Sequence, residues 1–322
     1  MKVKIVIQLL AVLGMLIGIL PVHDALAQPI QVEIDPNAPY IPGEVVVVFA
    51  PGMTNAQYKA QATALAGQVG AAVTDRYDRF ALLSFAPSID VEAVARALAS
   101  TGQVVWAQPN YQYWFPEKAD SIIGDALMTD GYDAPSIKGG MERLTWDQVS
   151  QLARPYRKSS TPVFPNEFPS GRFWGWDRVQ ADLIWNNTSA SPTVCVLDTG
   201  VQRTHPDLSG RVVNGYDFVN GDAYSDDDNG HGTHVAGIIA AKLNNGANTA
   251  MGISNRSVLA VKVLNAQGYG SSYSVAAGLL YCARNASVGV INMSFGSTAK
   301  DKLVWDVMNF AVNPSNLLAN GP

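Results

Sequence analysis

Two stretches decide the fold of this chain: Thr-Val-Cys-Val-Leu-Asp-Thr-Gly-Val at 193–201 and Asn-Gly-His-Gly-Thr-His-Val-Ala-Gly at 229–237. The first is an apolar run that ends abruptly on a carboxylate and a glycine. This pattern is typical of a buried parallel strand whose C-terminal end carries Asp198 into a crevice. The second is a loop of small residues that opens a helix, with His231 at its start. An aspartate at a strand end and a histidine at a helix start are two of the three parts of a nucleophilic hydrolase.

These stretches, together with His-Pro-Asp-Leu at 205–208, resemble the subtilisin-like serine proteases, in which the catalytic aspartate precedes the histidine in the chain. The resemblance implies that Asp198 accepts a hydrogen bond from His231 and fixes its tautomer. It implies that His231 takes the proton of a serine nucleophile and returns it to the leaving amine of a polypeptide substrate.

The resemblance also identifies two segments that would hold a peptide substrate between them as an added strand. Their residues are Gly268, Tyr269 and Gly270 in one segment, and Ser294, Phe295 and Gly296 in the other. Tyr269 and Phe295 would line the side-chain pockets, which indicates an apolar preference.

An acidic run precedes the histidine, and it has two interpretations. Members of the resembled family often bind structural calcium, so Asp226, Asp227 and Asp228 are candidate calcium ligands. A solvated acidic loop explains the composition equally well. A zinc hydrolase does not fit, because His231 and His234 are three residues apart and no glutamate lies between them.

Composition narrows the class of protein further. The chain has 322 residues and a net charge of −5, and no basic block indicates a nucleic-acid partner. Its two cysteines, Cys195 and Cys282, both lie in apolar stretches. They are interpreted as two buried free thiols, with a single disulfide as the alternative in a secreted protein.

The N-terminus predicts secretion. Lys2 and Lys4 precede an apolar run at 5–20, and Ala-Leu-Ala at 25–27 is a small-x-small cleavage site. Residues 1–27 are therefore expected to be a signal peptide that is removed. The run is short for a bilayer span, so no stable membrane anchor is expected after cleavage.

Residues 40–115 alternate between strand-like and helical patterns and predict a small α+β domain. Expected helices begin after a capping box at Thr54 and Gln57, and at Val91. The expected strands are 44–49, 73–77, 81–85 and 104–106. The order β-α-β-β-α-β is the ferredoxin-like split unit.

Between a signal peptide and a subtilisin-like motif, this domain resembles the inhibitory prodomain of that family. The resemblance implies an intramolecular inhibitor whose tail, 108–115, lies in the substrate cleft like a peptide. An unrelated accessory domain is the alternative. Residues 116–170 lack clear periodicity and are interpreted as a linker with one helix at 141–152.

Residues 171–322 are expected to form the N-terminal part of a subtilisin-like peptidase domain. Strands are expected at 194–197, 258–264 and 288–293, and helices at 233–243 and 275–284. Strands separated by helices predict an α/β fold, a parallel sheet with helices on both faces.

The nucleophile is missing from the pattern. The resembled family carries it in a Gly-Thr-Ser-Met-Ala-type motif, and no Gly-Thr-Ser occurs in this chain. Met308 to Val312 are expected to begin the next strand of the family, before Pro314 departs from the pattern. The prediction is therefore a secreted serine endopeptidase precursor, C-terminally truncated and inert as it stands. The alternative is a secreted, non-catalytic module that binds and inhibits a related protease.

Overall fold

The computed structural model describes residues 34–115, 181, 192–246 and 252–312. The predicted signal peptide at 1–27 and the predicted linker at 116–170, with its helix, lie outside the described residues. Within the part of the chain that is described, no helix is both long enough and apolar enough to cross a membrane.

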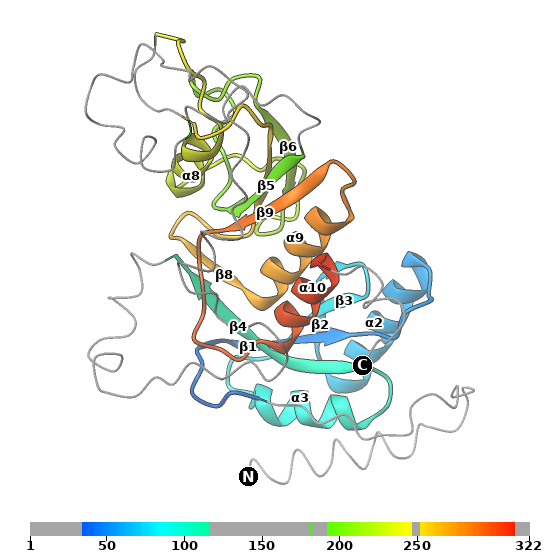
Figure 1. Cartoon of the computed structure of the whole chain (residues 1–322). Helices are drawn as coiled ribbons and strands as arrows, with labels where there is room; N and C mark the ends of the chain where they lie inside the picture. The colour runs from blue at the N-terminus through cyan, green and yellow to red at the C-terminus, as the bar shows by residue number, and fades with distance from the viewer. Residues whose placement is uncertain (1–33, 116–180, 182–191, 247–251, 313–322) are drawn as a thin grey trace, which may run out of the picture.

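The N-terminal half is the predicted ferredoxin-like unit. Its elements are β1 (Tyr40–Val48), α2 (Asn55–Val69), β2 (Ala72–Tyr77), β3 (Phe80–Ser84), α3 (Val91–Ser100) and β4 (Trp106–Trp114). The four strands form an antiparallel sheet in the order β2-β3-β1-β4, which confirms the expected fold (Figure 1).

Helix α2 begins where its capping box predicts. The Thr54 N–H donates to Gln57 Oε1 at 2.7 Å, and the Gln57 N–H donates to Thr54 Oγ1 at 3.3 Å. These two bonds satisfy backbone donors that a helix start leaves without partners. The helix ends at Gly70, whose left-handed φ of 69° suits a residue without a Cβ.

Strand β4 is much longer than the predicted strand at 104–106. It runs from Trp106 to Trp114, so the predicted tail is a continuation of the sheet. The reason is that β4 gains a second partner: it pairs with β1 as far as Tyr111 and then with the short strand β8 (Tyr269–Ser271) through 112–114.

The C-terminal half is built on a parallel sheet, as predicted. Its elements besides β8 are β5 (Thr193–Asp198), β6 (Val212–Asp217), α8 (His231–Ala240), β7 (Val258–Lys262), α9 (Ser272–Arg284), β9 (Val288–Met293) and α10 (Lys302–Val312). The strand order is β6-β7-β5-β9, and all the pairs are parallel.

Alternate side chains of the central strand β5 face opposite sides of this sheet. Cys195 and Leu197 are buried in the cluster that contains α9, whereas Val196 is buried against Ala236 and Ala240 of α8. Helices α8 and α9 therefore cover opposite faces, as the alternation of strands and helices predicts (Figure 1).

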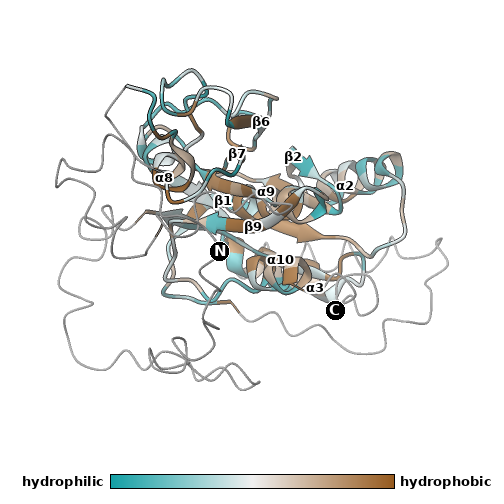
Figure 2. Cartoon of the chain, turned by 45° about the horizontal axis from the view of Figure 1, so that its top comes forward, coloured by the Kyte–Doolittle hydropathy of each residue, from teal (hydrophilic) through white to brown (hydrophobic). Residues whose placement is uncertain are grey.

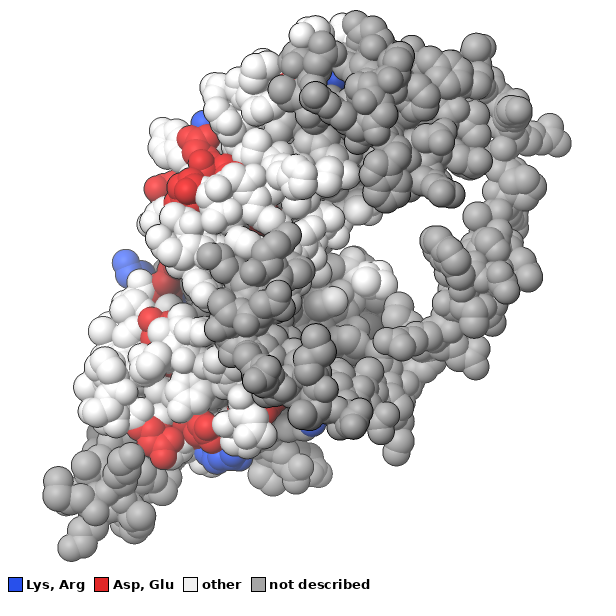
Figure 3. All heavy atoms as spheres, turned by 90° about the vertical axis from the view of Figure 1, so that its left-hand side faces the viewer, with Lys and Arg blue, Asp and Glu red and all other residues white. Residues whose placement is uncertain are grey.

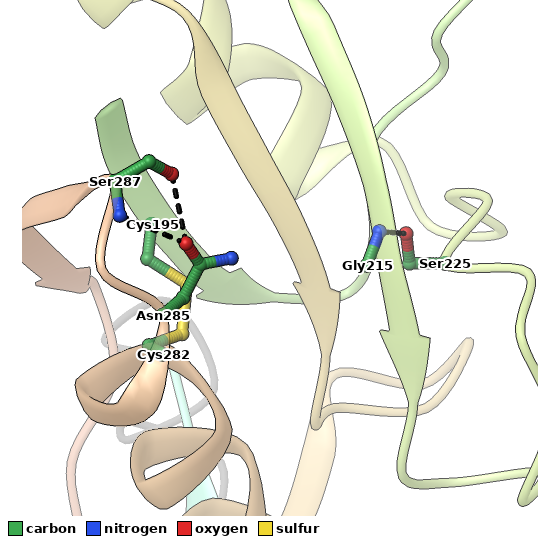
Figure 4. Close-up of a disulfide and its surroundings, with 6 residues drawn as sticks. All are labelled: Cys195, Gly215, Ser225, Cys282, Asn285 and Ser287. Atoms are coloured by element: carbon green, nitrogen blue, oxygen red, sulfur yellow. Dashed lines mark hydrogen bonds between the residues drawn. A yellow bond between two sulfur atoms is a disulfide. The ribbon is translucent and has the colours of Figure 1, made fainter. Parts of the chain in front are cut away.

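The two cysteines form a disulfide, so the interpretation as free thiols is wrong. Cys195 points from β5 toward α9, and Cys282 lies on the face of α9 that covers the sheet, with 6.1 Å between their Cα atoms (Figure 4). This separation is within the range that a disulfide spans. The bond joins the strand that ends at Asp198 to helix α9.

The two halves share one hydrophobic core. Val46, Val48 and Trp106 of the N-terminal sheet are buried in the same cluster as Leu279 of α9 and Val307 of α10. Figure 2 shows the apolar residues of β1, α9 and α10 gathered at this junction. The N-terminal sheet therefore docks on α9 and α10 by burial of apolar surface.

The prediction that 308–312 begin a strand is wrong, because these residues end helix α10. Leu303, Val304, Val307 and Phe310 are buried at helical spacing on its inner face. The structure thus has α10 where the family resemblance predicted the start of a sheet strand.

Candidate active site

Asp198 and His231 meet at the carboxyl end of the parallel sheet. Asp198 is the last residue of β5, and His231 is the first residue of α8. The imidazole Nδ1 of His231 lies 2.8 Å from Oδ1 of Asp198. The expectation that the two side chains lie within bonding reach is confirmed.

Two glycines allow this close approach. Gly230, before the helix, has a φ of 106°, which a residue with a Cβ rarely adopts. A Cβ on Gly232 would lie 2.1 Å from the backbone oxygen of Gly200 and 3.0 Å from Cβ of Asp198. The small residues of the 229–237 stretch are therefore what lets α8 start against the end of β5.

The Asp198 carboxylate is fully buried. Burial raises its pKa, and the hydrogen bonds from His231 and from the Thr199 N–H, the latter 2.7 Å long, offset only part of that effect. The pKa of Asp198 is consequently above its usual value. A raised pKa means that the fold tolerates the ionised carboxylate at a cost in stability.

Hydrogen bonds to Asp227 connect the start of α8 to Thr199, the residue that follows Asp198. Its carboxylate accepts hydrogen bonds from the Thr199 hydroxyl at 2.8 Å, from the N–H groups of Asn229 and Gly230, and from the N–H and hydroxyl of Thr233. Burial alone would raise the pKa of Asp227, but these bonds outweigh it and lower the pKa.

Lys262 makes a second connection that sequence reasoning missed. Its buried ammonium donates to the Thr199 carbonyl at 2.8 Å, the Leu264 carbonyl at 2.7 Å and Asp228 Oδ1 at 2.6 Å. It thus joins the segments before His231 and after Asp198. The one signal in the sequence is a lysine that ends an otherwise apolar strand, β7.

The three aspartates proposed as calcium ligands do not converge. Asp226 pairs with Arg203 at 3.0 Å, Asp227 caps the start of α8, and Asp228 pairs with Lys262. Among the described residues, no three His, Cys, Asp or Glu side chains are grouped so that they could hold a metal ion. These three aspartates therefore do not together form a calcium site, and Figure 3 shows acidic side chains in separate groups on the face that it displays.

The two predicted substrate edges lie on either side of the end of β4. Tyr113 pairs with Gly270 and Trp114 pairs with Tyr269 in antiparallel register. On the other side, the Trp114 N–H donates to the Gly296 carbonyl at 3.0 Å, and the Gly296 N–H donates back at 2.9 Å. The structure therefore brings both edges together with the tail as a strand between them.

Two aromatic residues of the tail contact predicted site residues, one His231 and the other Phe295. The Phe115 ring stacks on the His231 imidazole, with 4.4 Å between ring centroids. A Cβ on Gly268 would lie only 2.0 Å from Cε1 of Phe115, so this glycine makes room for the ring. Tyr113 contacts Phe295 edge-on, with 6.0 Å between centroids.

Both halves of the chain match known protein families. Residues 189–317 match the subtilase family, and residues 27–110 match the fervidolysin N-terminal prodomain. A thermophilic serine proteinase of Bacillus sp. (strain AK1) is 31% identical over 87% of this chain, and thermitase of Thermoactinomyces vulgaris is 39% identical over 48%. Residues 189–317 are a subtilase-family domain.

The chain spans 58% and 56% of the lengths of those two relatives. The crystal structure of fervidolysin from Fervidobacterium pennivorans, a keratinolytic enzyme related to subtilisin, has the same fold. It superposes with a TM-score of 0.53 at 19% identity, over 87% of this chain and 39% of that one.

The hydroxyl groups of Ser271, Ser272 and Ser294 are each engaged in hydrogen bonds to groups other than His231. The Ser271 hydroxyl accepts a hydrogen bond from the Ser274 N–H and caps α9, and the Ser272 hydroxyl bonds to Asp301. The Ser294 hydroxyl accepts from Asn292 at 3.0 Å. His234, in the first turn of α8, is exposed.

Proposed function

We propose that this chain is the precursor of a secreted serine endopeptidase that hydrolyses peptide bonds with an Asp-His-Ser triad. The observation that carries the proposal is the 2.8 Å contact between Asp198 and His231 beside two backbone edges that already hold an extended strand. The match of residues 189–317 to the subtilase family supports it.

Asp198 and His231 would divide the work of proton transfer. Nδ1–H of His231 donates to Asp198, which fixes the tautomer and stabilises the imidazolium that forms in the transition state. Nε2 then takes the proton of the serine hydroxyl and returns it to the leaving amine. The connections made by Asp227 and Lys262 keep the two segments at this spacing.

The N-terminal half would act as an intramolecular inhibitor. Residues 112–115 lie along the edges that a substrate would use, and the Phe115 ring covers a face of His231. A peptide substrate pairs with such edges through its backbone, so it would compete with this tail for the same hydrogen bonds.

The nucleophile is proposed to lie outside these 322 residues, since they contain no Gly-Thr-Ser sequence. On this proposal, the 322 residues alone do not hydrolyse peptides, and the triad is completed by a further segment. Removal of the predicted signal at 1–27 would release the protein outside the cell.

A chimera tests this proposal. The chain is joined to the part of thermitase that follows its matched region, and hydrolysis of a chromogenic peptide is measured for the chain and for the chimera. We expect hydrolysis by the chimera only, and only after limited digestion has removed its N-terminal domain. His231→Ala should abolish this hydrolysis, and His234→Ala, the matched control, should retain it. A folded chimera that stays inactive after this digestion would count against the protease proposal. Hydrolysis by the 322 residues, abolished by His231→Ala, would show that the chain contains its own nucleophile.

A further inference from the structure

The starts of helices α9 and α10 lie together beneath strand β4. The Tyr273 N–H, in the first turn of α9, donates to Asn110 Oδ1 at 3.0 Å. The Leu303 N–H, in the first turn of α10, donates to Gln108 Oε1 at 3.2 Å. The prodomain strand therefore supplies one side-chain amide oxygen to each helix start, where backbone N–H groups need acceptors.

The buried carboxylate of Asp301 lies between these contacts. Asp301 is 8% exposed and immediately precedes α10. Its Oδ1 accepts from Gln108 Nε2 at 2.9 Å and from the Val304 N–H at 3.1 Å. Its Oδ2 accepts from the Tyr113 hydroxyl at 3.0 Å and from the Ser272 hydroxyl. Two of these four donors, Gln108 and Tyr113, come from the prodomain strand.

The direction of each bond is fixed by chemistry. An ionised carboxylate can only accept hydrogen bonds, so the groups that face Asp301 must donate. Burial and the neighbouring Asp301 carboxylate raise the pKa of Tyr113 well above its usual value, so its hydroxyl keeps its proton. Gln108 meets both requirements at once, because its oxygen accepts from Leu303 and its NH2 group donates to Asp301.

Charge decides what can replace Gln108. Two helix starts would ordinarily favour a carboxylate on the strand that covers them. Here Asp301 already supplies the negative charge, and a glutamate at position 108 would place a second oxygen about 3 Å from Asp301 Oδ1 in a buried site. Two carboxylates that close cannot both be ionised without a large cost.

We propose that Asp301 is the group by which the subtilase domain recognises its prodomain. It accepts a strand that presents a neutral amide at position 108 and a hydroxyl at position 113, and it rejects a strand that presents a carboxylate at position 108. The partner class is therefore a prodomain strand with amide and phenol donors at these positions. This inference concerns docking and holds whether or not the chain hydrolyses peptides.

An amide–carboxylate exchange in the full chain tests the proposal. Gln108→Glu, Asp301→Asn and the double variant are compared with the parent by hydrogen exchange at the Trp114 N–H, which reports the pairing of the tail with Gly296. We expect Gln108→Glu to speed this exchange at least about tenfold. The double variant should recover most of the loss, since the introduced asparagine amide can then donate to the introduced glutamate. Gln112→Glu is the control, because it adds the same charge to β4 at a half-buried position.

Two results would overturn the proposal. One is an exchange rate in Gln108→Glu within twofold of the Gln112→Glu control. The other is a double variant whose exchange is as fast as that of Gln108→Glu, or which fails to fold when Asp301→Asn folds. If Gln108→Glu itself does not fold, recovery of a folded protein by the added Asp301→Asn exchange supports the same recognition rule. Peptide hydrolysis plays no part in these measurements, so the protease proposal stands or fails separately.

Discussion

The phenyl ring of Phe115 lies parallel to the imidazole of His231, with 4.4 Å between their centroids and 6° between their planes. The tail of the prodomain thus shields the histidine that the proposed mechanism uses as a base. Phe115→Ala should expose this face, so His231 should react several-fold faster with an acylating reagent. Phe115→Tyr retains the ring and serves as the control. Equal rates in the alanine variant and the parent would show that the ring does not protect the histidine.

Gly268 has a φ of +80°, and a Cβ there would collide with Phe115. Gly268→Ala should therefore lower the free energy of unfolding by about 1–3 kcal/mol through the clash, in addition to the backbone strain. Gly102→Ala is the matched control, because its φ of +70° is similar but no atom lies within 4 Å of its Cβ position. Denaturant unfolding measures both variants, and equal losses would contradict a specific contact with Phe115.

Burial raises the pKa of Asp198 in the folded protein. A raised folded-state pKa means that stability is highest below the unfolded-state pKa and is lost as pH rises through the folded-state value. Asp198→Asn removes the buried charge, so it should unfold at a higher temperature than the parent at pH 7. The difference should shrink as pH falls through the folded-state pKa and should be gone below about 4, the usual pKa of an aspartate. A variant less stable than the parent at pH 7 would mean that the bond to His231 outweighs the cost of burial.

Asp227 has the opposite dependence on pH. Burial raises the pKa of Asp227, but the surrounding hydrogen bonds outweigh burial and lower it. The Asp227 carboxylate therefore stabilises the folded protein above the unfolded-state pKa, and this stabilisation is lost as pH falls through the folded-state pKa. Asp227→Asn should cost about 2 kcal/mol at pH 7, and the cost should disappear in acid. Thermal unfolding between pH 7 and pH 2 checks this. A penalty that is independent of pH would indicate lost packing instead of a lost charge.

Lys262 holds three segments together with one buried ammonium group. Lys262→Met should cost about 2–4 kcal/mol, because two buried carbonyl oxygens and Asp228 lose their donor. Lys302→Met, at a partly exposed lysine paired with Asp306, should cost less than about 1 kcal/mol. Unfolding in denaturant gives both values, and similar costs would argue against a special role for Lys262.

Local patterns predicted the elements that local forces determine. The capping box at Thr54 and the strand and helix ends at Asp198 and His231 depend on neighbours close in the chain. Two strands were missed for physical reasons. β6 carries Asn-Gly in its middle, and β8 is only three residues long, so neither has a clear apolar alternation.

Local sequence patterns could not predict the contacts between segments that are distant in the chain. Lys262 reaches Thr199 across 63 residues, and Asp301 reaches Gln108 across 193. The sequence also identified Asp226 to Asp228 by composition alone, whereas the structure gives each carboxylate a different partner. Acidic residues that are close in sequence need not point to one place.

Strand β4 is hydrogen-bonded to β1 through its first part and to β8 through its last part, without a break between the two. Cutting the chain beyond Phe115 would therefore leave the backbone edges at β8 and Gly296 occupied, because the cut end remains part of an intact five-stranded sheet. Latency would persist until the whole N-terminal domain unfolds or is digested. The durability of that small domain, more than the speed of the cut, would then determine when substrates gain access.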